Sequence, residues 1–266
     1  MLTLRSTREI GLMRRAGLVV WKAHHDAAKL VRPGVTTAEL DAAVEVVFAR
    51  FGAVPMFKGV PGKVPFPAAT CTSVNDAVVH GIPGDRVLRE GDIVSLDTGC
   101  RLNGWCGDSA YTHAVGVIRP EVQRLLDTTR ESLELAIRLM AVKRLWSEVA
   151  EEMAKLIRGR GFSVVDQFSG HGIGREMHEE PSVPNFANAE TRRRDFELKP
   201  GVVVAIEPMV NMGRKECRCL ADHWTQVTAD GKPSAHFEHT IAITAAGPRV
   251  LTSAPETDEE RAFVGE

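Results

Sequence analysis

Two aspartates flank a predicted β-turn, and their spacing suits them to bind a cation. Asp97 and Asp108 lie on either side of Asn103-Gly104, and an Asn-Gly pair between strand-like runs is a strong hairpin signal because both central residues must adopt positive φ. In a hairpin with a two-residue turn, the aspartates are diagonal neighbours on one face, with Cβ atoms about 7–8 Å apart. Carboxylates this close repel each other. We therefore expect a positive group, and first a metal ion, between them.

Two glutamates and a histidine extend this set. Glu207 ends the apolar run 202–207, and Glu238 lies in the apolar run 237–243. An ionised carboxylate in an apolar strand is costly unless it is paired or metal-bound, although a structural salt bridge is an alternative for Glu207. His171 lies between Gly170 and Gly172, where the backbone can closely approach a ligand.

These five side chains form a hard, oxygen-rich donor set, which fits one or two divalent cations better than a thiolate zinc site. Four carboxylates balance the charge of two such ions. Two ions about 3.5–4 Å apart can share a water, lower its pKa and provide a nucleophile at neutral pH. Mixed Asp, Glu and His sites accept Co²⁺, Mn²⁺, Fe²⁺ or Zn²⁺. His80 and His178 would then be neutral donors around the substrate, although a core or capping role is the alternative for His80.

The elements that must position these residues alternate between helices and strands. Residues 6–30 and the segment from Thr36 to Gly52 show helical periodicity, and two further helices follow Pro120 and residues 143–144. Strands are predicted at 70–74, 92–116, 164–170, 202–207 and 237–243, and a polar loop at 179–199. The buried stripe of the second helix superimposes on that of the fourth at an offset of 109 residues. This duplication predicts one α+β domain over residues 1–266 with half-repeats of roughly 6–116 and 119–252, helices outside a curved, mostly antiparallel sheet, and the site between the halves.

Composition excludes several classes of protein. The net charge of -2 gives no basic excess for a nucleic-acid partner, and no apolar run is long enough to span a membrane. The first residues do not form a secretory signal. The five cysteines lack metal-knuckle spacing, so we expect reduced thiols in a cytoplasmic protein.

The ordered motifs resemble those of the type I methionine aminopeptidases, a family with the pita-bread fold. The seven matching blocks are VVHGIP (78–83), SLDTG (95–99), GDS (107–109), GHGIG (170–174), MHEEP (177–181), IEPMV (206–210) and FEHT (237–240).

The resemblance implies a role for each residue. Asp97 would be a terminal ligand of one metal, Asp108 and Glu238 would bridge both metals, and His171 and Glu207 would complete the set. Glu207 would also shuttle a proton, His178 would contact the scissile carbonyl and its oxyanion, and His80 would contact the peptide nitrogen. The methionine pocket would be lined by Phe66, Cys71, Met177 and Trp224, and a weaker monovalent-cation site would involve Asn75 and Ser234. Met177 and Lys63 depart from residues common in the family and bear on this pocket, not on the metals.

The activity implied by the resemblance is removal of the initiator methionine from nascent polypeptides, favouring a small second residue, by attack of a water or hydroxide that bridges the two metals. Nascent N-termini would be the partner, the ribosome is a candidate partner, and the protein is expected to be a monomer. Two alternatives keep the fold: a proline-specific dipeptidase or aminopeptidase, and a non-catalytic binding protein. Proline-specific relatives carry an extra N-terminal domain that is not expected here, and the filled ligand positions disfavour a binding protein.

Overall fold

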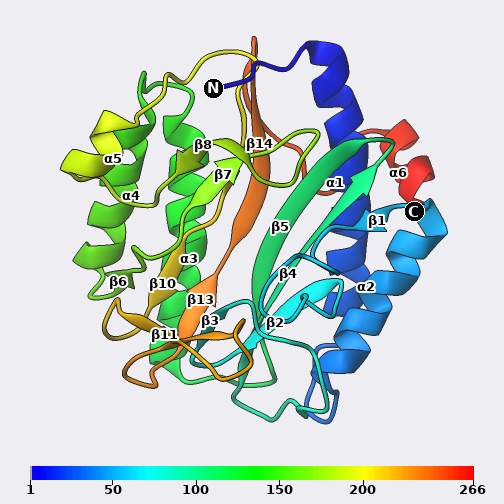
Figure 1. The fold of residues 1–266 in the computed structure, drawn as a ribbon, viewed down its shortest axis with the longest axis vertical. Coiled ribbons are helices and arrows are strands. Elements are labelled where there is room, and N and C mark those ends of the chain that lie inside the picture. The colour runs from blue at the N-terminus through cyan, green and yellow to red at the C-terminus, as the bar shows by residue number, and fades with distance from the viewer. Residues whose placement is uncertain (1) are drawn as a thin grey trace.

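A nine-stranded sheet forms the centre of the computed structural model, which describes residues 2–266. Its strand order is β1-β4-β5-β14-β9-β7-β8, with β2 added beside β4 and β15 beside β14, and each of these pairings is antiparallel. The strands are β1 (Val54–Pro55), β2 (Thr70–Val74), β4 (Ile93–Leu102), β5 (Trp105–Ala114), β7 (Gly170–Gly172), β8 (Glu179–Val183), β9 (Val203–Ile206), β14 (Glu238–Thr244) and β15 (Gly247–Val250). As Figure 1 shows, β5 and β14 run side by side through the middle of the molecule.

Two smaller sheets extend the fold at one end of the central sheet (Figure 1). One has the order β13-β10-β6 and the other β11-β12-β3. Their strands are β3 (Ala77–Val79), β6 (Ser163–Val164), β10 (Met209–Asn211), β11 (Cys217–Cys219), β12 (Gln226–Thr228) and β13 (Ser234–His236).

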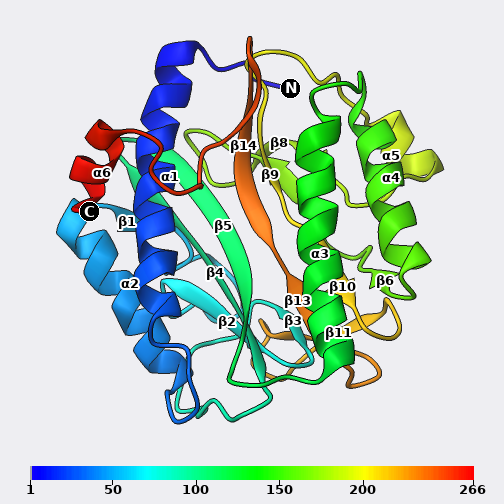
Figure 2. The same ribbon diagram turned by 180° about the vertical axis from the view of Figure 1, so that it is seen from behind.

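The helices begin and end where the sequence provides the appropriate capping residues. Ser6 and Glu9 form a capping box at the start of α1 (Thr7–Ala28), and Thr36 and Glu39 form another at α2 (Thr37–Phe51), which ends at Gly52 with a φ of 63°. The remaining helices are α3 (Pro120–Leu139), α4 (Trp146–Gly159), α5 (Ala189–Arg193) and α6 (Asp258–Val264). Seen from behind (Figure 2), α1 and α3 lie over one face of the sheet, with α2 and α4 outside them.

Two hydrophobic cores lie under these two pairs of helices. One joins α1 and α2 to β4 through Val20, Leu40, Phe48 and Leu96. The other joins α3 and α4 to β9 and β14. This arrangement agrees with the predicted pairing of helices with strands, and the assignment of two half-repeats within one domain stays a prediction.

The hairpin that carries both aspartates forms as the Asn-Gly pair predicts. Leu102 pairs with Trp105 and Gly99 pairs with Asp108, and Asn103 and Gly104 have φ values of 50° and 78°. Two predicted segments are wrong. Residues 164–170 do not form one strand, because β6 and β7 belong to different sheets, and the supposed loop at 179–199 contains β8 and α5.

Helix α1 packs directly against the strand that carries Asp108. A Cβ atom built on Gly107 would lie 2.8 Å from the Gly17 nitrogen, and one built on Gly17 would lie 2.1 Å from the Leu251 carbonyl oxygen. Only glycine allows backbones to approach this closely. The back of the hairpin that carries both aspartates is therefore held by main-chain contact. Within residues 2–266, no helix has both the length and the apolar character needed to cross a bilayer.

Candidate metal centre

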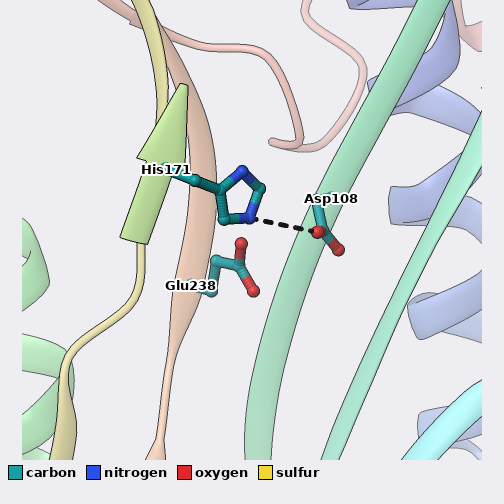
Figure 3. Close-up of side chains that lie close together, drawn as sticks. All are labelled: Asp108, His171 and Glu238. Carbon is teal, nitrogen blue, oxygen red and sulfur yellow. Dashed lines mark ion pairs between the residues drawn. The ribbon is translucent and has the colours of Figure 1, made fainter. Parts of the chain in front are cut away.

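Three side chains from three strands converge over the central sheet. Asp108 of β5, His171 of β7 and Glu238 of β14 each offer a ligand atom, and these atoms lie within 4.8 Å of one another. Figure 3 shows the imidazole and the two carboxylates pointing toward a common point. All three residues are buried. The sequence separates them widely, and the order β5-β14-β9-β7 brings them together.

Asp97 and Glu207 border the same pocket as these three residues. Asp97 comes from β4, the other arm of the hairpin, and Glu207 directly follows β9. The distance from His171 Nε2 to Glu207 Oε1 is 3.6 Å, and that to Asp108 Oδ2 is 3.8 Å. The structure thus collects all five side chains that the sequence proposes as ligands around one cavity.

A cation would stabilise this group of buried carboxylates. The pKa values of all four carboxyl groups are raised, mainly by burial, and neighbouring carboxylates raise the pKa values of Asp97, Glu207 and Glu238 further. Among the described residues, Asp97 Oδ1, Asp108 Oδ1 and Glu238 Oε1 are buried oxygens without a hydrogen-bond partner. Buried polar atoms without a partner are costly in free energy.

The state of His171 strengthens this conclusion. Burial lowers its pKa to about 4, so the ring is neutral at pH 7. Its Nδ1 lies 2.9 Å from the Gly172 carbonyl oxygen, which requires the proton on Nδ1 and leaves the Nε2 lone pair facing the carboxylates. A lone pair cannot donate a hydrogen bond to a carboxylate, whereas both can bind the same cation. The donor set therefore fits divalent metal ions.

The pocket beside these ligands has an apolar wall. Phe57, Val60, Phe66, Cys71 and Trp224 line it together with His80 and His178. The rings of Phe66 and Trp224 meet edge to face, with their centroids 5.3 Å apart. His178 is exposed at the mouth, where its ring centroid lies 4.3 Å from that of His171. His80 has a φ of 60°, and burial lowers the pKa of its imidazole.

Met177 lies beside the carboxylates, outside the set of residues that line the pocket. It is buried in a cluster with Ile10, Met13 and Cys106. A Cβ atom built on Gly99 would lie 2.4 Å from Met177 Cε and 2.8 Å from Asp108 Oδ1, so Met177 lies on the face of the hairpin that carries Asp108. Its place in the methionine pocket stays a prediction. Lys63 is exposed.

Asn75 and Ser234, the residues expected to hold a monovalent cation, do contact each other. The Ser234 N–H donates to the Asn75 carbonyl oxygen at 2.9 Å. The side chain of Asn75 donates to Asp92 and accepts from the Ile93 N–H. The cation itself stays a prediction.

One residue near the carboxylates was missed by the sequence reasoning. His236 is buried, and its Nε2 lies 3.9 Å from Glu238 Oε2 and 4.0 Å from Glu207 Oε2. Burial lowers the pKa of this imidazole to about 3. The alternation of side chains along an extended chain places His236 on the same face as Glu238, and this signal was available in the sequence.

Comparisons with known proteins agree with this geometry. Residues 11–245 match the model of metallopeptidase family M24. "Methionine aminopeptidase 1" of Bacillus subtilis is 44% identical over 252 residues, covering 95% of this chain and 99% of that protein. "Methionine aminopeptidase" of Clostridium perfringens is 46% identical with the same coverage.

Solved structures give the same answer for the fold. The methionine aminopeptidase of Thermotoga maritima superimposes with a TM-score of 0.90 at 38% identity, covering 95% of this chain and all of that one. A prolidase from Pyrococcus furiosus has a TM-score of 0.74 at 22% identity, which shows the shared pita-bread fold alone. The predicted fold class is confirmed, and the chain belongs to metallopeptidase family M24 and, within it, to the methionine aminopeptidases.

Proposed function

We propose that this protein removes the N-terminal methionine from nascent polypeptides, favouring substrates with a small second residue. The observation that carries the proposal is the group of four carboxylates and one neutral imidazole beside an apolar pocket. The M24 relatives that match nearly the full chain are named methionine aminopeptidases. The reaction is a hydrolysis: water adds across the first peptide bond, and the products are free methionine and the shortened chain.

Five residues would hold the divalent cations. Asp97 is proposed as a terminal ligand, Asp108 and Glu238 as bridging ligands, and His171 and Glu207 as the completing pair. Two such cations, of Co²⁺, Mn²⁺, Fe²⁺ or Zn²⁺, would lower the pKa of water and polarise the scissile carbonyl. Their charge would balance that of the four carboxylates, which supports two ions over one.

The remaining groups would bind the substrate and move protons. The walls formed by Phe66, Cys71 and Trp224 offer an apolar, polarisable surface for a thioether side chain. His178, exposed at the mouth, would donate a hydrogen bond to the oxyanion that develops on the carbonyl oxygen. His80 would contact the peptide nitrogen, and Glu207 would take the proton from water and deliver it to the leaving amine.

The expectations about the cell are part of this proposal. We propose a cytoplasmic monomer that acts on nascent N-termini, with the ribosome as a candidate partner and one monovalent cation near Asn75 and Ser234. No specific nucleic acid and no membrane are proposed as partners, consistent with a net charge of -2.

Cleavage of a Met-Gly-Met peptide, compared with an X-Pro dipeptide, tests the activity. The protein should release methionine from the first and leave the second intact. Exhaustive chelation should stop release, and adding back Mn²⁺ or Co²⁺ should restore it. Release that survives chelation would refute the metal-dependent reaction, and cleavage of the X-Pro dipeptide alone would refute the substrate assignment.

A further inference from the structure

Strands β5 and β14 separate at the metal centre. They are paired through only two residue pairs, Ala110 with Glu238 and Ser109 with His239. Continuing this register would place Asp108 opposite Thr240, but the main chains do not pair there. The strands diverge at the residue whose carboxylate enters the site.

The side chain of Thr240 fills the place of the missing main-chain pair. Its hydroxyl accepts the Asp108 N–H at 3.0 Å and donates to the Asp108 carbonyl oxygen at 2.8 Å. A hydroxyl has one donor and two acceptor positions, so it can make both bonds at once. Thr240 is fully buried, and water does not compete for these bonds. The peptide groups on both sides of Asp108 are thereby held in place.

The same arrangement recurs at the other end of this two-pair ladder. The Thr112 hydroxyl accepts the His236 N–H at 2.9 Å and donates to the His236 carbonyl oxygen at 2.8 Å. Thr112 lies on β5 and Thr240 on β14, so each of the two strands supplies one threonine. The residues held in this way, Asp108 and His236, both have side chains that approach Glu238.

Thr240 is itself held in place. Its N–H donates to the Thr252 hydroxyl at 3.2 Å, and its carbonyl oxygen accepts the Leu251 N–H at 2.8 Å. Behind Asp108, the backbone of Gly107 rests against that of Gly17. The main chain at Asp108 is thus fixed from both sides. This fixes the position of its carboxylate relative to Glu238 and His171, which come from other strands.

We propose that Thr240 is a positioning residue of the metal centre, an inference that rests on the proposed function. Its hydroxyl lets β5 and β14 separate by the width of a side chain while Asp108 keeps two main-chain hydrogen bonds. Without the hydroxyl, a buried N–H and a buried carbonyl would lose their partner, and the strand would shift to recover them. Asp108 would then lose its alignment with Glu238 and His171.

The test compares Thr240→Val, which keeps the shape and removes the hydroxyl, with Thr240→Ser, which keeps the hydroxyl. The matched control is Thr129→Val, because Thr129 is a buried threonine whose hydroxyl donates to the Leu125 carbonyl oxygen within α3, away from the pocket. Mn²⁺ affinity is measured by isothermal titration calorimetry after chelation and dialysis, and melting temperature is measured in chelator.

Thr240→Val should weaken Mn²⁺ binding by roughly 10–100-fold, the usual effect of removing a partner that orients a metal ligand. Thr240→Ser keeps the hydroxyl and should bind Mn²⁺ with nearly the affinity of the wild type. Thr129→Val should lower the melting temperature and leave the affinity unchanged. Wild-type affinity in Thr240→Val, or equal losses in the Val and Ser variants, would overturn the inference.

A second variant keeps the test decisive if Thr240→Val does not fold. Thr240→Ala leaves space for a water molecule that can bond the Asp108 peptide groups, so it should fold. This water is not anchored to β14 as the hydroxyl is, so Asp108 is aligned less well and Mn²⁺ should bind more weakly than in Thr240→Ser. Wild-type affinity in Thr240→Ala would overturn the inference. A wild-type protein that binds neither Mn²⁺ nor Co²⁺ would instead overturn the proposed function, and the positioning role with it.

Discussion

Glu238→Gln should stabilise the metal-free protein and destabilise the metal-loaded one. Burial and the neighbouring carboxylates, Asp108 first, raise the pKa of Glu238. Its pKa in the folded protein lies above the ordinary value of 4.5, so ionisation of Glu238 lowers the free energy of unfolding. This penalty is absent below pH 4.5 and grows as the pH rises toward the folded pKa. Glutamine has nearly the same shape and removes this penalty. It also removes a proposed bridging ligand.

Two limiting estimates give the same size for the penalty at pH 7. If Glu238 is ionised, its repulsion with Asp108, whose ligand oxygen lies within 4.8 Å, is about 3 kcal/mol at that upper limit and an effective dielectric constant of about 20. If Glu238 is protonated, holding a proton at pH 7 on a group whose ordinary pKa is 4.5 also costs about 3 kcal/mol. Up to about 3 kcal/mol corresponds to a rise in melting temperature of roughly 6–12 °C for a domain of this size.

Differential scanning calorimetry of both proteins in chelator and in excess Mn²⁺ measures the effect. In chelator at pH 7 the variant should melt above the wild type, and the difference should close near pH 4.5. In Mn²⁺ the order should reverse, because an ion at about 1,000 times its dissociation constant stabilises the wild type by roughly 4 kcal/mol, which exceeds the penalty of up to about 3 kcal/mol. Glu134→Gln, at an exposed position of α3, is the control and should shift neither curve. A variant that melts below the wild type in chelator at pH 7 would refute the reasoning.

Three further predictions follow from other features. His178→Ala should lower kcat by about a hundredfold with methionyl peptides if the imidazole stabilises the oxyanion; a change confined to KM, seen in steady-state kinetics, would instead indicate substrate positioning. Gly17→Ala should destabilise the fold by about 1–3 kcal/mol in urea titrations, because its Cβ would lie 2.1 Å from the Leu251 carbonyl oxygen. The control Gly11→Ala, in the same helix with open space around it, should stabilise the fold by up to about 1 kcal/mol. Equal changes in stability in the two variants would contradict this account. Glu260→Gln should cost about 2 kcal/mol at pH 7, which is less than the full pKa shift implies because solvent screens this partly exposed pair. Hydrogen bonds from Arg14 lower the pKa of Glu260 from 4.5 to about 2, so the contribution is complete above pH 4.5 and is lost as the pH falls through 2. Urea titrations at pH 7 and pH 2 that show the same difference would exclude it.

The features that sequence could predict were those fixed by local chemistry. Asn103-Gly104 set the hairpin and its register, and Thr36 with Glu39 set the start of α2. The five proposed ligands came from three local signals: the hairpin spacing for Asp97 and Asp108, a carboxylate in an apolar strand for Glu207 and Glu238, and flanking glycines for His171. Each of these signals lies within a few residues of the structure that it specifies.

The missed features depend on contacts between distant segments. The polar strand β8 forms because β7 pairs with it at the edge of the sheet, and its own residues carry little strand signal. Val165 packs in a cluster with Val78 and Met209, so the chain crosses from one sheet to another where a single strand was expected. The function of the Thr240 hydroxyl depends on a strand that precedes it by more than a hundred residues, and no local pattern reports such a contact.

The central position of β14 also affects how the chain folds. This strand lies between β5 and β9 and connects the two sides of the central sheet, yet it begins only at Glu238. Until that segment has been synthesised, β5 and β9 each present an unpaired edge, and such edges promote aggregation. The pairing of β5 with β14 also joins residues far apart in sequence, which slows folding. The newly made chain therefore passes through a long interval in which its two sides are unconnected, and this favours assistance by chaperones during its synthesis.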